Sequence, residues 1–303
     1  MTANTANTAN TANTANVGNA GMAGTWDAAW LLPDRVDLPF VEEQGESKPI
    51  KDEIREGLGL NAYPERGWAA KWYSWRVLHE FLGTSWQTDA DARVDQVWQS
   101  QVVNPPSGGG LNAELRGLAR AARDERPEAL AEILSQDGEF LSDFMGVLSI
   151  TPASHPATYR IMHIVVTLGT YAVIVMKEKF QRPRPSHLLP ALRPPVPMPG
   201  HASFPSGHAT QANLMALLLG HVLDRASAAP GGLSDGDRQV LKSSLDVLAR
   251  RVARNREIAG LHYPSDSKAG QELARSICES LKSSMPAAGL FARAVSAAKD
   301  EWT

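Results

Sequence analysis

The sequence predicts an all-α fold, a helical bundle, on three observations. Apolar residues recur at helical spacing in many segments, whereas the strict alternation typical of strands is scarce. Stretches rich in Pro and Gly separate these segments and mark their ends. The chain has 303 residues, of which 43% are hydrophobic, so it can bury one large core.

The chain divides into three predicted regions. Residues 1–20 include five Thr-Ala-Asn triplets, a polar repeat that buries little and is expected to form a disordered tail. It has neither a basic start nor an apolar run, so we do not expect a secretory signal. Residues 21–150 are predicted to be a helical and irregular extension, and seven of the eight tryptophans lie before residue 100, which favours packing of this extension on the core. Residues 151–303 are predicted to be the catalytic core.

Helical spacing and helix-breaking residues set the expected elements. In the extension, helices are predicted at residues 69–82, 90–103, 111–123, 127–136 and 139–149, with a break at NPPSGGG (104–110). In the core, helices are predicted at residues 157–181, from 206 onward, 234–258, 264–283 and 286–299. The segment 182–205 carries eight prolines and is predicted to be a rigid loop without helix.

Composition excludes several classes of protein. The formal charge of −3 does not resemble the basic surface of a nucleic-acid binder. Cys278 is the single cysteine, so no intrachain disulfide and no cysteine-rich zinc site can form, and we expect a buried helix thiol. The longest apolar run, Ile161–Met176, is shorter than the roughly 20 residues that cross a bilayer. We therefore expect a core helix, no transmembrane segment, and a soluble, cytoplasmic protein.

Lys177 and Arg184 form the first pattern that suggests chemistry. Seven residues are close to two helical turns, so both cations can lie on one face, and Pro185 follows at once. Pro183 ends the helix, which lets Arg184 turn into a cleft. Lys179 and Arg182 are expected to point elsewhere. Taken alone, the pattern also fits a basic helix end that interacts with its own dipole.

The second pattern is the sequence Pro-Ser-Gly-His at residues 205–208, directly before an apolar helix. Ser206 is a good N-cap, and the N–H groups of Ser206 and Gly207 would face a bound anion. Gly207 lets a ligand approach the backbone closely. His208 would then lie in the first turn beside that anion. A simple helix cap with an incidental histidine is the alternative.

Arg256, His262 and Asp266 form the third pattern. His262 and Asp266 are four residues apart, so the carboxylate can hold one imidazole nitrogen and leave the other free as a nucleophile. Arg256 adds a planar fork that suits phosphate oxygens. The three patterns together predict an oxyanion site with a nucleophile and an acid, and nothing in it requires a metal or another cofactor.

These patterns resemble the three sequence blocks of the type 2 phosphatidic acid phosphatase (PAP2) and vanadium haloperoxidase superfamily. The blocks are K-x6-R-P, P-S-G-H and S-R-x5-H-x3-D, and here they stand at residues 177–185, 205–208 and 255–266. Order and internal spacing match across about 90 residues, whereas the first 150 residues add nothing to the resemblance. One position departs, because Asn255 replaces the usual serine and leaves one expected contact in doubt.

The resemblance implies a metal-independent phosphatase that acts on a small-molecule phosphate ester. In it, Lys177, Arg184, Arg256, Ser206 and Gly207 would bind the phosphate oxygens. His262 would attack phosphorus and form a phosphohistidine, His208 would protonate the leaving oxygen, and Asp266 would orient His262.

Two alternatives remain open at this point. A vanadium haloperoxidase would hold vanadate in the same site, with His262 as the vanadium ligand. His201, seven residues before His208, resembles a histidine of the bromide-oxidising members, or it is an ordinary loop histidine. A noncatalytic anion-binding protein is the other alternative, and Asn255 is its single support. The sequence gives no indication of the oligomeric state, and His163 is expected to be a core histidine.

Overall fold

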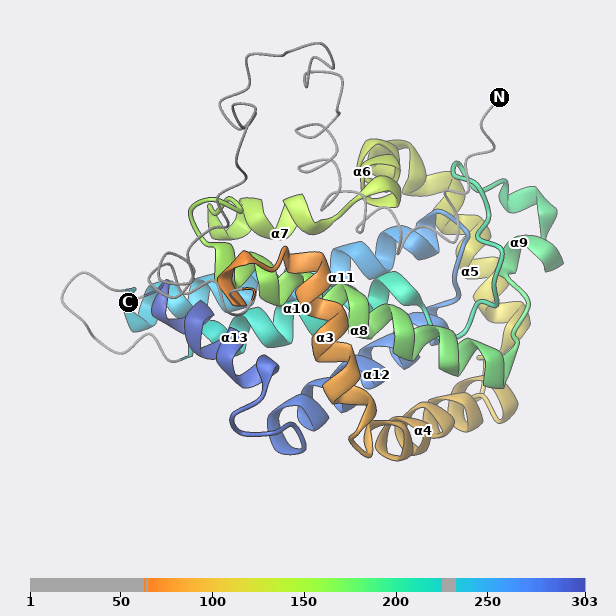
Figure 1. Ribbon diagram of the computed structural model, residues 1–303. Helices are drawn as coiled ribbons and strands as arrows, with labels where there is room; N and C mark the ends of the chain where they lie inside the picture. Colours follow the sequence, from red (N-terminus) through yellow and green to blue (C-terminus); the bar gives the residue numbers. More distant parts are fainter. Residues whose placement is uncertain (1–62, 64, 225–232, 303) are drawn as a thin grey trace, which may run out of the picture.

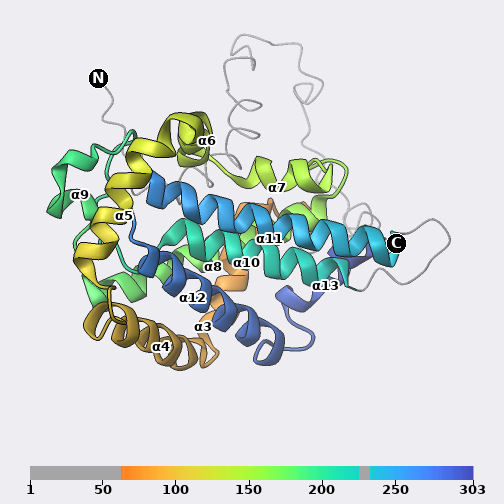
Figure 2. The same ribbon diagram turned by 180° about the vertical axis from the view of Figure 1, so that it is seen from behind.

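The computed structural model describes residues 63, 65–224 and 233–302, and this part of the chain is helical, with no strand (Figures 1 and 2). The predicted all-α class is confirmed. The expected tail, residues 1–20, lies outside the described residues, as does the irregular arm up to residue 62.

The observed elements follow the predicted order closely. The extension contains the short turn η2 (Glu65–Gly67), α3 (Ala70–Leu82), α4 (Trp86–Val97), the π-helical η3 (Trp98–Val103), α5 (Leu111–Asp124), α6 (Arg126–Gly138) and α7 (Leu141–Leu148). The core contains α8 (Pro156–Phe180), α9 (Pro185–Leu188), the 3-10 turn η4 (Pro190–Leu192), α10 (Gly207–Leu223), α11 (Asp235–Ile258), α12 (Pro264–Ser283) and α13 (Leu290–Asp300).

Three predicted boundaries are corrected. The helix expected at 90–103 starts at Trp86 and widens into a π-helical turn, and the last helix starts at Leu290 rather than at 286. The proline-rich loop is not free of helix. Pro185 and Pro190 each open a short helical turn, because proline already has the backbone angle of a first helical position and its missing N–H is not needed there.

Helix α10 occupies the centre of the bundle and contacts α8, α11 and α12 (Figure 2). Helix α3 packs across α8 on the opposite face, and α4 packs against α12 (Figure 1). The contact between α10 and α12 is close at Gly270. A Cβ atom there would lie 2.8 Å from the carbonyl oxygen of Ser206 and 2.9 Å from the Cβ of Ala209. This glycine therefore lets α12 pack directly against the first turn of α10.

Helix α8 is held at both ends. Its N-terminal amides at Ala157 and Thr158 donate to the carboxylate of Glu301, at 2.6 and 2.8 Å. The indole of Trp302 donates to the hydroxyl of Thr158 at 3.0 Å. At the other end Gln181 adopts a left-handed conformation, with φ of 47°, and stops the helix. The residues that follow α13 thus supply the N-terminal cap that α8 lacks locally.

The expectation that no segment is long and apolar enough to cross a membrane is corrected. Within the described residues, the segment Pro156–Leu188 meets those criteria, with a mean hydropathy of 1.5 over its best window. The helix continues beyond both ends of the apolar run Ile161–Met176, which is why the longer window qualifies. Since 61% of that window is buried inside the protein, it also fits a core helix of a globular bundle.

Helices α5 and α6 lie at one end of the bundle, on the side of α9 (Figures 1 and 2). Two small apolar clusters join them to the loops of the core. Their buried members are Ala121, Ile133, Val196, Ile258, Ala259 and Leu261 in one cluster, and Leu118, Leu192 and Tyr263 in the other. These clusters fix α5 and α6 against the turn between α11 and α12.

Candidate active site

Lys177 lies in the last turn of α8 and is buried. Its ammonium group donates to the carbonyl oxygens of Ala202 at 2.6 Å and Ser203 at 2.8 Å. Burial, together with the charge of Arg184, lowers the pKa of Lys177 well below its usual value. Two of its three donors thus hold the loop that leads to α10.

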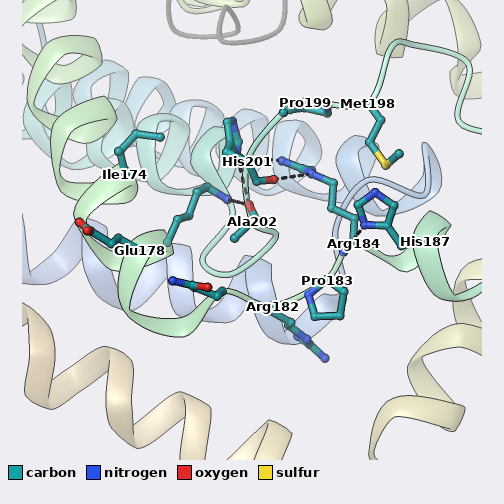
Figure 3. A pocket seen from close by; sticks show the side chains of 13 residues that line it. Ile174, Glu178, Arg182, Pro183, Arg184, His187, Met198, Pro199, His201 and Ala202 are labelled. Atoms are coloured by element: carbon teal, nitrogen blue, oxygen red, sulfur yellow. Dashed lines mark hydrogen bonds between the residues drawn. The ribbon is translucent and has the colours of Figure 1, made fainter.

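Arg184 is fully buried and joins two loops. Its Nε donates to the carbonyl oxygen of His201 and its Nη1 to that of Leu261, both at 3.0 Å. Nη2 lies 3.1 Å from Nδ1 of His201, and Nη1 lies 3.4 Å from Nε2 of His262 (Figure 3 shows Arg184 and His201). Burial lowers the pKa of Arg184 to about 10, so the guanidinium remains charged at neutral pH.

Ser206 caps α10, because its Oγ accepts a hydrogen bond from the N–H of Ala209. The prediction that the Ser206 N–H faces an anion is wrong, since that group donates to the carbonyl oxygen of Asp266 at 3.0 Å. Gly207 begins the helix, where the first amides have no acceptor within the helix. A Cβ at Gly207 would meet only Val173, at 3.7 Å, so the backbone is open to a ligand on that side.

His208 lies in the first turn of α10 and is buried. Its Nε2 lies 3.1 Å from the carbonyl oxygen of Gln136, so this nitrogen carries the hydrogen and donates. Nδ1 is then the nitrogen available to a ligand. Burial and the charge of Arg256 hold the pKa of His208 well below its usual value, which makes the ring neutral in the free protein.

Arg256 lies at the end of α11 and is fully buried. Nη2 donates to the carbonyl oxygen of Ile133 at 2.7 Å, and Nη1 donates to the carboxylate of Asp137 at 3.2 Å. Its Nε is buried and has no hydrogen-bond partner in the described part of the chain. Burial lowers the pKa of Arg256 to about 10, so the group remains a cation. A buried charged donor without an acceptor is costly, and an oxyanion would supply that acceptor.

His262 and Asp266 form the expected pair. Nδ1 of His262 lies 3.2 Å from Oδ2 of Asp266, which also accepts the N–H of Tyr263 at 3.0 Å. Burial alone would raise the pKa of Asp266, but the hydrogen bond from His262 and the charge of Arg182 outweigh it and lower that pKa. Burial holds the pKa of His262 well below its usual value. A neutral His262 that donates from Nδ1 keeps its lone pair on Nε2.

Most of these residues line two adjoining pockets. The inner pocket is small, about 30 Å³, and its polar lining consists of Arg184, His201, Gly207, His208, Arg256 and His262, with Thr170 and Gln211. The outer pocket is about 710 Å³ and is lined by Lys177 together with Ile174, Glu178, Met198 and the segment 181–184 (Figure 3). Arg184 and His201 line both pockets. Arg184, Gly207, His208, Arg256 and His262 therefore meet at the inner pocket, whereas Lys177 lines the outer one and Ser206 and Asp266 line neither.

Comparison with known proteins identifies the family. Residues 158–282 match the model of the PAP2 superfamily. The chain is also 30% identical over 164 residues to decaprenylphosphoryl-5-phosphoribose phosphatase of Mycobacterium tuberculosis, covering 52% of this chain and 81% of that protein. The chain belongs to the PAP2 superfamily. The corresponding phosphatase of Mycolicibacterium smegmatis is 29% identical over 157 residues, covering 50% of this chain and 76% of that protein.

A solved PAP2 structure is also similar, though distantly. It is the transmembrane phosphatidylglycerolphosphate phosphatase of Bacillus subtilis, 18% identical, covering 65% of this chain and 84% of that one with a TM-score of 0.34. A TM-score this low adds nothing to the fold described above. The expected soluble, cytoplasmic placement gains no support from these PAP2 relatives.

The PAP2 sequence pattern does not reveal two residues that hold the carboxylate of the His262–Asp266 pair. Arg182 was expected to point away from the site, but its Nη1 donates to Oδ1 of Asp266 at 2.7 Å and to the hydroxyl of Ser265 at 2.7 Å. Ser203 donates to the other carboxylate oxygen of Asp266. Neither residue carries a distinguishing spacing in the sequence; the one signal for Arg182 is that it stands two residues before Arg184.

Asn255, which departs from the PAP2 pattern, does not line either pocket. Its side-chain amide is buried and donates to Oε1 of Gln136 at 2.9 Å. Asn255 thus holds α6 and makes no contact with either pocket. In the described residues no group of three or more His, Cys, Asp or Glu side chains could hold a metal ion. The inner pocket instead offers cationic and N–H donors, which suit a tetrahedral oxyanion such as phosphate or vanadate.

Proposed function

We propose that this PAP2 protein hydrolyses small-molecule phosphate monoesters without a metal, through a phosphohistidine intermediate on His262. One observation carries the proposal. His262 lines the inner pocket together with Arg184 and Arg256, while Nδ1 of its ring is held by Asp266. The relatives named above are phosphatases, which supports the reaction class.

The phosphoryl group would occupy the inner pocket. Arg184 and Arg256 would donate to its nonbridging oxygens, and the N–H of Gly207 at the start of α10 would add a backbone donor. The unpartnered Nε of Arg256 supports this placement. Because these donors are already fixed by other contacts, little reorganisation accompanies the development of charge in the transition state.

In the first step the lone pair on Nε2 of His262 attacks phosphorus. The bond between phosphorus and the ester oxygen breaks, and the leaving oxygen takes a proton from Nδ1 of His208. His208 must be protonated for this, and the bound anion raises its pKa from the low value of the free protein. Asp266 stabilises the positive charge that develops on His262.

In the second step water attacks the phosphohistidine. The neutral His208 accepts a proton from this water, the bond between phosphorus and Nε2 breaks, and inorganic phosphate leaves. His262 returns to its neutral form and His208 is again protonated, so the cycle closes without another reactant.

The organic part of the ester would lie in the outer pocket, which joins the inner one at Arg184 and His201. Its lining includes the apolar side chains of Ile174, Met198 and Pro199 as well as Glu178 (Figure 3). The mycobacterial relatives are named for a phosphoribose ester, so a pentose 5-phosphate belongs among the first substrates to test.

The proposal is tested by hydrolysis of p-nitrophenyl phosphate and of a pentose 5-phosphate in the presence of a chelator. We expect activity that orthovanadate inhibits, and a phosphorylated protein, stable to base and labile to acid, in quenched reactions. His262→Ala should remove both activity and label, whereas the exposed His79→Ala on α3 should retain them. Activity that survives in His262→Ala would contradict the proposal.

Vanadium haloperoxidase remains the second candidate, because His201 lines both pockets beside Arg184. The same residues that would bind phosphate would hold vanadate, with His262 as the ligand of vanadium. Bromide oxidation that requires orthovanadate and peroxide, without ester hydrolysis, would favour this candidate over the phosphatase.

A further inference from the structure

The hairpin formed by α5 and α6, Leu111–Gly138, lies outside the segment that matches the PAP2 family, yet it contacts the site from two sides. Only Glu125 separates the two helices. Each helix reaches a different catalytic histidine, α5 through a chain of side chains and α6 through a backbone carbonyl.

The α5 arm begins at Glu114. Its Oε2 accepts from Nη2 of Arg182 at 2.8 Å, and its Oε1 accepts from the N–H and the hydroxyl of Ser265 at 2.9 and 2.6 Å. Nη1 of Arg182 then donates to Asp266 at 2.7 Å, and Asp266 holds Nδ1 of His262. A carboxylate, a guanidinium and a second carboxylate thus connect α5 to the nucleophile.

The burial of this arm separates it from an ordinary surface ion pair. The side chains of Glu114, Arg182 and Asp266 are 13%, 5% and 0% exposed. The guanidinium of Arg182 lies 3.7 Å from the centre of the Tyr263 ring, and Tyr263 packs on Leu118 of α5. An ion pair on the surface does little to fix its side chains. Here the guanidinium of Arg182 is buried, stacks on Tyr263 and is held by a carboxylate on each side, so its orientation is fixed.

The α6 arm ends at His208. Gln136 lies in the last turn of α6, whose carbonyls lack donors within the helix, and its carbonyl oxygen accepts from Nε2 of His208 at 3.1 Å. Two further contacts fix this turn: Arg256 donates to the carbonyl oxygen of Ile133, and Asn255 donates to the side chain of Gln136. The carbonyl therefore sets which nitrogen of His208 carries the hydrogen.

We propose that the α5–α6 hairpin is a positioning element for both catalytic histidines, with Glu114 and Arg182 orienting His262 and the end of α6 orienting His208. This inference rests on the proposed phosphatase function for its kinetic consequences. The tautomers of the two rings give a readout that does not depend on activity.

The kinetic test uses two phosphate esters that differ in their leaving groups. p-Nitrophenolate leaves with little help from an acid, whereas an alkoxide needs a proton. Glu114→Gln weakens the chain of contacts through Arg182 and Asp266 that orients His262. It should lower kcat for both esters alike, by roughly 10-fold, with little change in KM. Gln136→Met removes the contact from Asn255 that fixes the last turn of α6, so the carbonyl that orients His208 can shift. It should slow the alkyl ester several-fold more than the p-nitrophenyl ester. Glu128→Gln, an exposed position on α6, is the matched control and should behave as the wild type.

The second test is the nitrogen NMR spectrum of protein labelled with ¹⁵N-histidine. The wild type should show His262 protonated at Nδ1 and His208 protonated at Nε2, assigned from His262→Gln and His208→Gln. Glu114→Gln should mix the tautomers of His262 alone, and Gln136→Met those of His208 alone. The charged groups around these rings, Lys177, Arg184, Arg256 and Asp266, are unchanged in both variants.

The outcomes separate the inference from the proposed function. A folded Glu114→Gln protein with wild-type kcat and unmixed tautomers overturns the α5 arm, and equal slowing of both esters in Gln136→Met overturns the α6 arm. If Glu114→Gln does not fold, Arg182→Lys, which keeps the charge but loses the fork, should give the same kinetic pattern. A wild type that cleaves neither ester overturns the phosphatase proposal, while the NMR result still decides the positioning of the rings.

Discussion

Replacement of His163 tests whether a buried, unpartnered imidazole destabilises this fold in acid. His163 lies in the middle of α8, is 3% exposed, and its Nε2 has no hydrogen-bond partner in the described part of the chain. The ring of Tyr159 lies edge-on at 4.7 Å. Burial, together with the charge of Lys71, lowers the pKa of His163 from 6.5 to about 4.

The sign and the size of the change in unfolding free energy with pH follow from this pKa shift. Between pH 6.5 and about 4 the unfolded chain binds a proton that the folded chain does not, so stability is complete above pH 6.5 and is lost as the pH falls. At about 1.4 kcal/mol per pH unit, the full loss is about 3 kcal/mol, of which about 2 kcal/mol has occurred at pH 5. The variant His163→Leu should not show this loss, and it should be more stable at every pH because it removes a buried polar atom that has no partner.

The assay is urea unfolding of the wild type and His163→Leu at pH 7.5 and pH 5. We expect the difference in unfolding free energy to move in favour of the leucine variant by about 2 kcal/mol on acidification. His163→Gln is the matched control, because it does not titrate but keeps a buried polar group. Relative to the wild type, its unfolding free energy should improve on acidification as that of His163→Leu does. At pH 7.5, however, it should not be more stable than the wild type. Parallel loss of stability in the wild type and His163→Leu would refute the reasoning.

Three further substitutions test the packing, the anion pocket and the cap of α8. Gly270→Ala places a Cβ atom 2.8 Å from the carbonyl oxygen of Ser206 and should destabilise the protein by about 1–3 kcal/mol in urea unfolding; unchanged stability would contradict the close packing of α10 and α12. Arg256→Lys removes the buried Nε donor and should lower kcat/KM by about 100-fold or more, whereas the exposed Arg250→Lys on the same helix should have no effect. Glu301→Gln weakens the cap of α8 and should lower the unfolding free energy by about 1 kcal/mol, with an unaltered Tm as the contrary result.

The sequence predicted the core helices because they depend on local signals, whereas it predicted the meeting of the three blocks from their combined chemistry and from the resemblance to the PAP2 superfamily. Apolar spacing gives α8, α10, α11 and α12, and a serine before an apolar run gives the N-cap of α10. The four-residue spacing of His262 and Asp266 lies within one turn, so their contact follows once the helix begins at Pro264.

The contacts that arise from tertiary packing could not be predicted in this way. Glu114 and Arg182 are 68 residues apart, and each alone resembles a surface charge. The acceptor of His208 is a backbone carbonyl, which carries no side-chain signal at Gln136. The N–H of Ser206 was assigned to a ligand because its acceptor, the carbonyl of Asp266, becomes its neighbour only when α12 packs on α10.

The cap of α8 by Glu301 links the core to the order of synthesis. The carboxylate and the amide of Ala157 are 144 residues apart in sequence. At the usual rate of about 5–20 residues per second, a ribosome needs roughly 7–30 s to travel from one to the other. During that interval the first amides of α8 have no partner from Glu301, and this cap can form only after Glu301 has emerged. The N-terminal cap of α8 therefore forms long after the helix itself has been synthesised.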